Sequence, residues 1–393
     1  MTLLAEGELS LDQLGKLRRR VSGQPLALEA LQLLVAAEPA LASRLQARIF
    51  PSILRHARAL LAAGEPELCT QQAQRPARTV IRRAEAAGWL AHMFLGTLPQ
   101  PSPEHPDLDF APLLSARWSP ETAKLRCVLT YFDRTADAPP SGCLEIERIT
   151  APGRTAEQWA ADSSPLLPLT VDTGATIEDA AGCRQVDFAN CYLGGGVLSG
   201  GCVQEEIRFA VAPELLVGMI VSPCMRESEA IVLRGAERFA STSGYARSLA
   251  YAGPFADPCP RAADGTPDVE LVAMDAVDYR RSNAQAQFGE PAIRRELGKA
   301  RSGFRRDARQ LPIATGNWGC GAFGGDLPLK AVIQWLAAAA EGRELRYFSF
   351  GDARVGNLAG FAATAQGHTV GALFKRLVCE AGGTNLYQRL LAS

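Results

Sequence analysis

One stretch of the chain brings together residue types that could carry out acid–base chemistry beside a bound anion. Val186 to Phe209 reads VDFANCYLGGGVLSGGCVQEEIRF. A short predicted strand delivers Asp187 and Asn190 to its end, and three consecutive glycines follow: Gly194, Gly195 and Gly196. Glycine lets a backbone approach a ligand closely, and successive N–H groups in such a loop can form an anion-binding nest.

The same stretch continues with a polar triplet at the start of a predicted helix: Gln204, Glu205 and Glu206. The positive end of a helix dipole favours carboxylates in the first turn, so a flexible loop followed by an acidic cap is the alternative interpretation. Glycines, Asp187, Asn190 and paired carboxylates in one stretch instead predict acid–base chemistry next to an anion. The stretch lacks both a GxGxxG fingerprint with a distant acidic residue and a P-loop lysine.

A second glycine-rich turn lies at Ala314 to Asp326, ATGNWGCGAFGGD, and a predicted helix from Leu327 to Ala340 follows it directly. A glycine-rich turn that leads into a helix N-terminus is a ready-made phosphate site. Its glycines surround Asn317 and Phe323, and the phenylalanine could pack on a sugar or a base. The alternative is a tight turn around a core tryptophan, Trp318.

Two such loops without a P-loop lysine predict one pyrophosphate held by backbone amides from both sides. Carboxylates beside the pyrophosphate favour acid–base work over phosphoryl transfer, which requires a metal site or a cationic clamp. The predicted chemistry is therefore cleavage of a bond close to a diphosphate-linked sugar.

Strands and helices alternate through the region that carries both loops. The predicted strands are Leu125 to Phe132, Leu144 to Ile149, Leu166 to Val171, Val186 to Ala189, Ala230 to Leu233 and Leu345 to Phe350. The predicted helices are Gln204 to Ala210, Glu290 to Ala300 and Leu327 to Ala340. This alternation predicts an α/β layered domain with a mainly parallel or mixed central sheet.

The first hundred residues are predicted to be helical, because apolar residues recur at helical spacing. Arg78 to Leu95 is expected to form one amphipathic helix, and the proline-rich stretch from Leu98 to Pro112 an extended connector. We therefore expect a helical accessory region over residues 1–122 and a catalytic domain over residues 123–393. Tyr251 to Asp268, rich in Pro, Gly, Asp and Ala, is expected to be a surface insertion.

Composition excludes several classes of protein. The formal net charge is -1, which argues against extensive duplex binding, and no apolar run reaches the roughly 20 residues that a membrane span needs. The 10 cysteines contain no CxxC pair, and the four histidines, His56, His92, His105 and His368, lie outside both glycine loops. We expect no metal, no cofactor and no membrane association. Because no targeting signal is recognisable, the expected location is the cytoplasm, or the nucleus in a eukaryote.

The two motifs resemble the signature of the poly(ADP-ribose) glycohydrolase family. VDFAN-x-YLGGGVLSGG-x-VQEEIRF resembles its glycines followed by QEE. ATGNWGCGAFGGD and YFSFGD resemble its later motifs in the same order, and TSGYA falls where the family has its tyrosine-bearing segment. Cys191 and Ser199 depart from the family pattern. The resemblance implies a three-layer α/β/α macrodomain with a mixed sheet and additional N-terminal helices.

The resemblance also implies roles for individual residues. Glu206 corresponds to the catalytic acid/base, Glu205 and Asn190 to the groups that hold the ribose at the scissile bond, and Asp187 to their support. The implied substrate-binding residues further include Gly194, Gly195, Gly196, Gln204, Asn317, Gly319, Gly321, Ala322 and Phe323 around the diphosphate. Ile177, Glu178 and Phe350 are implied on the adenosine side, and Tyr245 as the residue that closes over the ligand.

The reaction implied is hydrolysis of ribose–ribose bonds in poly(ADP-ribose), on modified proteins, by a monomer that releases ADP-ribose. The leaving oxygen needs a proton, and burial beside a like charge favours a protonated carboxyl group. Three alternatives remain: a macrodomain that binds ADP-ribose without hydrolysis, a hydrolase of mono-ADP-ribose on proteins, and a nicotinamide-dependent oxidoreductase. The intact QEE argues against the first, and the missing GxGxxG against the third.

Overall fold

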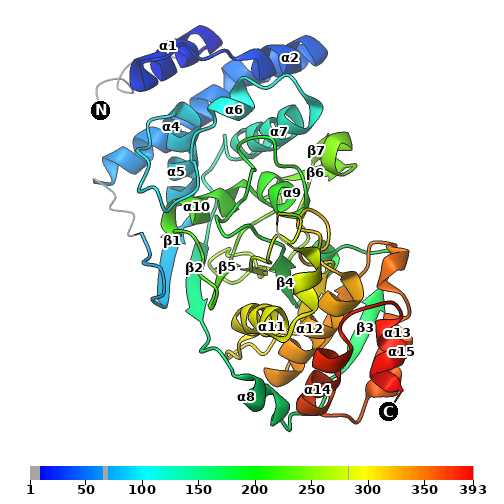
Figure 1. Cartoon of the computed structure of the whole chain (residues 1–393). Helices are drawn as coiled ribbons and strands as arrows, with labels where there is room; N and C mark the ends of the chain where they lie inside the picture. Colours follow the sequence, from blue (N-terminus) through cyan, green and yellow to red (C-terminus); the bar gives the residue numbers. More distant parts are fainter. Residues whose placement is uncertain (1–8, 65–69, 282, 393) are drawn as a thin grey trace.

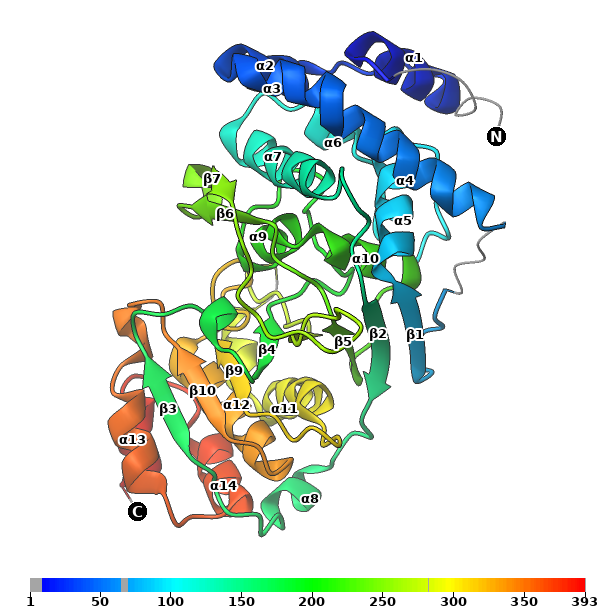
Figure 2. The same cartoon turned by 180° about the vertical axis from the view of Figure 1, so that it is seen from behind.

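The computed structural model describes residues 9–64, 70–281 and 283–392, and its central feature is an eight-stranded sheet in the order β1-β2-β5-β8-β4-β9-β10-β3 (Figure 1). The strands are β1 (Ala77–Arg82), β2 (Cys143–Thr150), β3 (Leu169–Asp172), β4 (Arg184–Asp187), β5 (Glu229–Arg234), β8 (Glu270–Ala273), β9 (Ile313–Gly316) and β10 (Leu345–Phe348). The five strands from β8 to β3 run parallel to one another, whereas the pairs β8–β5, β5–β2 and β2–β1 are antiparallel. The predicted mixed sheet is confirmed. Figure 2 shows β3, β10 and β9 at one side of the sheet, and β2 and β1 at the other.

Helices cover both faces of the sheet. In β5, Ile231 and Leu233 pack in one buried cluster, and the alternate residues Ala230 and Val232 pack in another. The first cluster includes α4 (Phe50–Ala62), α5 (Arg83–Leu95), α7 (Ser119–Arg134), α9 (Gln204–Val211) and α10 (Val217–Val221). The second includes α8 (Ala156–Ala160), α11 (Glu290–Phe304), α12 (Leu327–Ala340), α13 (Leu358–Ala365), α14 (Val370–Glu380) and α15 (Leu386–Leu391). Because successive strand residues point to opposite faces, this is the expected three-layer α/β/α arrangement.

The N-terminal helices gather at the end of the molecule opposite α13, α14 and α15 (Figure 1). They are α1 (Leu11–Ser22), α2 (Glu29–Ala37), α3 (Pro39–Arg44), the π-helical turn η2 (Leu45–Ile49), and the short α6 (Ala111–Leu114) within the proline-rich connector. The predicted helical character of this region is confirmed in α2 and α4. The division into regions 1–122 and 123–393 stays a prediction.

The single helix predicted for Arg78 to Leu95 is wrong in its first part. Ala77–Arg82 forms strand β1, which pairs antiparallel with β2, and α5 begins only at Arg83. The strand contains Thr79, Val80 and Ile81, whose β-branched side chains suit a pleated surface. Val80 is exposed and Ile81 is buried, which is strand alternation.

The strand predicted for Leu125 to Phe132 is also wrong, because this segment lies inside helix α7. Every residue from Ala123 to Asp133 is buried. A helix that is buried all round lacks the polar face that reveals a helical period, so a short apolar run of this kind resembles a buried strand. The correction places a buried helix next to α9.

The other predicted elements agree with the structure to within a few residues, whereas strands β8 and β9 were not predicted. The helices α9, α11 and α12 begin at the predicted residues, although α11 extends to Phe304, and the third predicted strand starts only at Leu169. Tyr251 to Asp268 is more integrated than a surface insertion, because its first residues belong to β7 (Ala250–Pro254), which pairs with β6 (Ala240–Ser243). Farther along it, Thr266 accepts a hydrogen bond from the N–H of Cys143.

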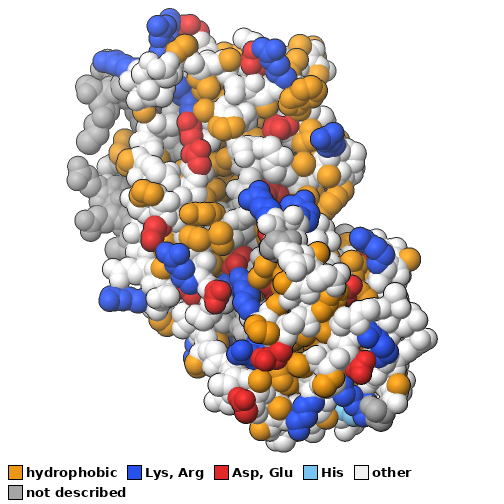
Figure 3. Space-filling view, viewed as in Figure 1, with side chains coloured by type: hydrophobic (Ala, Val, Ile, Leu, Met, Phe, Trp, Pro, Cys, Tyr) orange, Lys and Arg blue, Asp and Glu red, His pale blue; other side chains and the backbone are white. Residues whose placement is uncertain are grey.

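Charged side chains of both signs are distributed over the face seen in Figure 3, in agreement with the formal net charge of -1. Among the described residues, we find no helix with both the length and the hydropathy that crossing a membrane requires.

Candidate active site

Both glycine loops emerge at the same edge of the sheet, where β4 and β9 separate. The two strands pair through Arg184 with Ile313 and Gln185 with Ala314, and the pairing stops there, although each strand continues for two more residues. In parallel α/β sheets, ligands bind in a crevice beyond the carboxyl ends of such strands.

Two glutamine side chains occupy the hydrogen-bonding positions that the separated strands leave free. Gln204, the first residue of α9, donates to the carbonyl of Val186 at 3.3 Å and accepts from the N–H of Phe188 at 2.8 Å. Gln334 in α12 donates to the carbonyl of Gly316 at 3.0 Å. Each glutamine lies on the helix that follows a glycine loop, so both loops are fixed to the sheet. Gln204 was expected to contact substrate, but its amide is engaged with the backbone.

The two glutamates after Gln204 hold the first glycine loop in the same way. Glu205 accepts from the N–H groups of Asn190 at 2.8 Å and Gly194 at 2.6 Å. Glu206 accepts from those of Gly196 and Val203, both at 2.9 Å. The carboxylates are therefore fixed by charge-assisted hydrogen bonds. Each oxygen retains acceptor capacity for a ligand.

Gly195 has to be glycine for steric reasons. Its φ is +51°, and a Cβ there would lie 2.6 Å from Oε1 of Glu206 and 2.7 Å from Oε2 of Glu205. A Cβ on Gly201 would likewise lie 2.5 Å from Oε1 of Glu206. The loop backbone thus surrounds the Glu206 carboxylate at contact distance.

Asp187 completes a cluster of three buried carboxyl groups. Its exposed fraction is 1%, compared with 2% for Glu205 and 7% for Glu206, so Glu206 is the most accessible of the three. Neither oxygen of Asp187 has a hydrogen-bond partner among the described residues. Burial raises the pKa of Asp187 well above its usual range, which the nearby Arg208 offsets only in part. Burial, followed by the charges of Asp187 and Glu206, also raises the pKa of Glu205.

Lys124 in α7 supports the loop from behind and was missed by the sequence analysis. Its Nζ donates to the carbonyls of Ser199 at 2.6 Å and Gly196 at 3.3 Å, and also to that of Gly201. Burial lowers the pKa of Lys124 to about 8, although the charges of Glu206 and Glu121 oppose the shift. The segment had been interpreted as a strand, so nothing placed this lysine near the loop.

In the second glycine loop, the side chain of Asn317 is held from both sides. Its Nδ2 donates to the carbonyl of Ser349 at 3.3 Å, and its Oδ1 accepts from the hydroxyl of Tyr347 at 2.9 Å. Trp318 is fully buried and donates to the carbonyl of Met274, as the core-tryptophan alternative expected. Gly319 adopts a φ of +73°. Farther along the loop, Gly321 is exposed, and Ala322 and Phe323 are half-buried.

The residues expected on the adenosine side lie around the end of β9. Ile177, in the short 3-10 helix η3 (Ile177–Asp179), is buried against Ala314 and Phe348, and Glu178 is half-buried. Phe350 is 43% exposed, with a φ of +55°, which is an unfavourable conformation for a non-glycine residue. Its ring lies next to Gly316, since a Cβ there would be 3.0 Å from Phe350 and 3.5 Å from Phe188. The sequence analysis missed Phe188.

Tyr245 lies in the connection of the β6–β7 hairpin and is 54% exposed. The next residue, Ala246, donates its N–H to the carbonyl of Cys202 at 3.1 Å, which fixes the hairpin connection beside the start of α9. The structure thus brings Tyr245 close to the carboxyl cluster.

The histidines lie outside both glycine loops, as expected, but one of them lies beside the first loop. His105 in the proline-rich connector lines a cavity of about 300 Å³ together with Asn190, Tyr192 and Gly195 of the first glycine loop. His56 and His92 are buried in the helical layer, where burial lowers the pKa of His56 to about 4. A search of the described residues for three or more His, Cys, Asp or Glu side chains suited to one metal ion finds no such group.

Two family profiles match this chain. The family profile described as "Poly (ADP-ribose) glycohydrolase (PARG), Macro domain fold" matches residues 156–357, and the profile of the helical domain of the same family matches residues 38–148.

Individual relatives point to the same family. Poly(ADP-ribose) glycohydrolase 1 of Caenorhabditis elegans is 38% identical over 288 residues, which cover 68% of this chain and 35% of that protein. Poly(ADP-ribose) glycohydrolase 1 of Arabidopsis thaliana is 32% identical over 353 residues, covering 71% of this chain and 64% of that protein. The chain therefore spans between about one third and two thirds of the length of these relatives.

A solved structure of poly(ADP-ribose) glycohydrolase from Thermomonospora curvata, bound to the inhibitor ADP-HPD, is similar at 21% identity and a TM-score of 0.34. The similarity covers 57% of this chain and 83% of that chain. Because the macro-domain profile alone matches more than half of the 393 residues, this chain belongs to the poly(ADP-ribose) glycohydrolase family.

Proposed function

We propose that the chain hydrolyses the ribose–ribose O-glycosidic bonds of poly(ADP-ribose) and releases ADP-ribose, with Glu206 as general acid and base. The observation that carries this proposal is the position of Glu206. Its two oxygens are fixed by loop N–H groups, and it is the most accessible member of a buried cluster of three carboxyl groups. Oriented carboxyl groups of this kind are what glycoside hydrolysis requires.

The terminal ADP-ribose unit occupies the opening between β4 and β9. Its diphosphate lies between the two glycine loops, where backbone N–H groups on glycines such as Gly195 and Gly319 are accessible without a Cβ. Adenine lies toward Phe350, with Ile177 and Glu178 on the same side. The exposed ring of Tyr245 closes over the ligand from the β6–β7 hairpin.

The reaction then proceeds without a metal or a cofactor. Glu206 donates a proton to the leaving ribose oxygen as the glycosidic bond breaks, and the positive charge that develops on the sugar is stabilised by the bound diphosphate. Water attacks the anomeric carbon and returns a proton to Glu206. Glu205 and Asn190 orient the ribose hydroxyls, and Asp187 supports them from the end of β4.

The substrates of this proposal are poly(ADP-ribose) and the proteins that carry it, processed by a monomer. A single unit attached to a protein side chain is cut slowly, because no second adenosine ribose supplies the leaving hydroxyl. Free ADP-ribose competes as a product, whereas NAD competes weakly because its nicotinamide occupies the space of the leaving ribose.

The test is incubation of the purified chain with poly(ADP-ribose) in excess EDTA, followed by chromatography for free ADP-ribose. Glu206→Gln keeps the size of the side chain but removes the acid, so turnover should fall at least about 100-fold. ADP-ribose binding by this variant, measured by calorimetry, should remain within a few-fold of wild type.

Parallel assays use one protein that carries long chains and another that carries single units. Rapid removal of single units while long chains stay intact would replace this proposal with hydrolysis of mono-ADP-ribose. Near-normal turnover by Glu206→Gln would show that Glu206 is not the general acid and base.

A further inference from the structure

Four aromatic side chains are exposed among the described residues, and three of them belong to the candidate active site. Tyr192 and Phe350 lie on its loops, and Tyr245 on the adjacent hairpin. The fourth, Trp118, is the most exposed of all at 74%, and the mechanism does not use it. An exposed tryptophan of this size suggests a ligand with a flat face, because indole rings stack well on bases.

A cavity of about 360 Å³ lies beside Trp118. Trp118 and Glu121 line one side of it, and Ser199 and Gly200 of the first glycine loop line another. This volume is at the lower end of the range for small-molecule sites, roughly 300–1,000 Å³. One loop thus borders this cavity and holds the reacting carboxylate.

The glycine loop that lines the cavity also contacts Glu206. The residue after Gly200 is Gly201, where a Cβ would lie 2.5 Å from Oε1 of Glu206. Ser119, the residue after Trp118, donates its hydroxyl to the carbonyl of Leu249 at 3.4 Å, so the start of α7 contacts the hairpin that carries Tyr245. The cavity therefore borders the loop that surrounds the reacting carboxylate.

Charged side chains of both signs line the cavity. Arg117, which lines it, is paired with Glu29. Oε2 of Glu121 is buried without a hydrogen-bond partner, which costs free energy unless a donor approaches it. The site therefore suits a flat ring together with N–H or O–H donors, which describes an adenosine, with its exocyclic amine and ribose hydroxyls.

We propose that this cavity binds the adenosine of the neighbouring ADP-ribose unit, on the leaving side of the bond that is cut. Trp118 stacks on the adenine, and Glu121 accepts from the nucleoside. The proposal rests on the proposed function, in which the leaving hydroxyl belongs to the adenosine ribose of that next unit. The cavity would then recognise polymer over a single attached unit.

The binding test uses the intrinsic fluorescence of Trp118 in the Glu206→Gln variant, which leaves oligomers intact. The other four tryptophans, Trp89, Trp159, Trp318 and Trp335, are buried, so collisional quenching by iodide reports mainly on Trp118. Purified dimers of ADP-ribose should protect the fluorescence from iodide, and ADP-ribose alone should not. Equal quenching with and without the dimer would overturn the proposal.

The kinetic test compares Trp118→Ala with Trp118→Tyr. Removal of one base-stacking partner should lower kcat/KM for poly(ADP-ribose) by about 5- to 150-fold, mainly through KM, and tyrosine should restore most of it. Affinity for ADP-ribose should not change. The fold should persist, because the Trp118 side chain makes no capping hydrogen bond to α7. Val80→Ala, at an exposed position on β1, is the matched control.

These outcomes separate the two proposals. Wild-type kinetics for Trp118→Ala on polymer would overturn the adenosine site alone. A wild-type chain that binds ADP-ribose but leaves polymer uncut would overturn the proposed function.

Discussion

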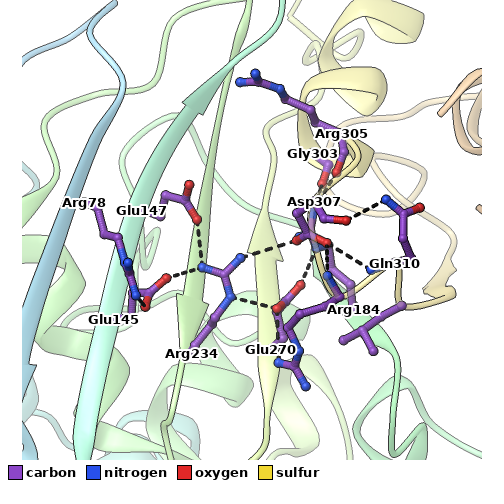
Figure 4. A network of polar contacts seen from close by, with 12 residues as sticks. Arg78, Glu145, Glu147, Arg184, Arg234, Glu270, Gly303, Arg305, Asp307 and Gln310 are labelled. Atoms are coloured by element: carbon purple, nitrogen blue, oxygen red, sulfur yellow. Dashed lines mark hydrogen bonds and ion pairs between the residues drawn. The ribbon is translucent and has the colours of Figure 1, made fainter.

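Buried charged groups lie at both ends of strand β4, but they are paired at one end and unpaired at the other. At its first residue, Arg184 lies in a network in which carboxylates and guanidinium groups alternate across the sheet (Figure 4). At its last residue, Asp187 has no hydrogen-bond partner among the described residues and lies with two more buried carboxyl groups. Both ends belong to one strand of four residues.

At the Arg184 end, every carboxylate shown meets a cation. Glu270 pairs with Arg184 at 2.5 Å and with Arg234 at 2.7 Å. Asp307 pairs with Arg184 and, at 3.0 Å, with Arg343. Burial alone would raise the pKa of Glu270, but Arg184 and Arg234 outweigh it, so its pKa lies below the usual value.

Similarly buried carboxyl groups therefore have opposite pKa shifts, because guanidinium groups pair directly with Glu270, whereas Arg208 only lies near Asp187. Breaking a charge pair at the amino end of β4 would reduce stability, because it leaves a buried charge without a partner. The unpaired carboxyl groups at the carboxyl end have raised pKa values, as is common for groups that exchange protons in active sites. The first prediction concerns the paired end, and the others concern the end that carries the candidate active site.

The largest expected effect on stability is that of Arg184→Met. It leaves Glu270 with one partner fewer in a buried position, so the free energy of unfolding should fall by about 3–5 kcal/mol, measured by urea denaturation. Arg78→Met removes an exposed partner of Glu145 at the rim of the same network and should change stability little. Similar losses for both variants would contradict the distinction between buried and exposed pairs.

Asp187→Asn should show the reverse behaviour: turnover falls about 100-fold, while stability is unchanged or higher. Because the pKa of Asp187 is raised on folding, wild-type stability should fall as the pH rises above roughly 4, and the variant should lack this contribution. Glu270, with its lowered pKa, contributes stability that is lost as the pH falls below roughly 4. Melting temperatures measured from pH 4 to pH 8 for both proteins provide the comparison, and parallel curves would refute it.

Gly195→Ala tests how closely the loop surrounds the carboxylates. The added Cβ would meet both glutamates at under 3 Å in an unfavourable backbone conformation, so kcat/KM should fall about 100-fold. Gly298→Ala is the control, since a Cβ there meets nothing within 4 Å and α11 should tolerate it. Wild-type activity of Gly195→Ala would mean that the loop moves freely.

The smallest expected effect is that of Lys124→Met, which removes an ammonium group that holds three loop carbonyls. We expect kcat/KM to fall about tenfold, because the loop is misplaced while the reacting groups remain. With the pKa of Lys124 at about 8, wild-type activity should also decline above pH 8 as the ammonium loses its proton. Three groups face this lysine and favour its protonated form: Glu206, Glu121 and Cys202.

The control for that variant is Lys375→Met, at an exposed position on α14. It should keep both the activity and the alkaline decline. An unchanged alkaline decline in Lys124→Met would assign that decline to another group.

Sequence reasoning succeeded where the information was local. The glycines and the QEE triplet lie within one short stretch, so their spacing alone placed a carboxylate pair beside a backbone nest. The same applies to α12, which follows its glycine turn without a gap. Helices with a clear period and short apolar strands such as β4 and β5 were found for the same reason.

The failures were of two physical kinds. Lys124 reaches carbonyls more than 70 residues away in the chain, and no local pattern reveals such a contact. Phe188 and His105 were missed for the same reason. Helix α7 was misassigned because it is buried on all sides, which hides its helical period. Strand β1 was misassigned because its pairing with β2 overrides the helical pattern of the local sequence.

The opening between β4 and β9 has a consequence for binding kinetics. Gln204 and Gln334 satisfy the strand groups that the opening exposes, so the cleft is complete before any ligand arrives. A ligand then has no strands to separate and no loop backbone to order. Most of the conformational entropy lost on association is therefore that of the ligand. Association should follow a single phase whose rate rises linearly with ligand concentration, as expected for a rigid receptor.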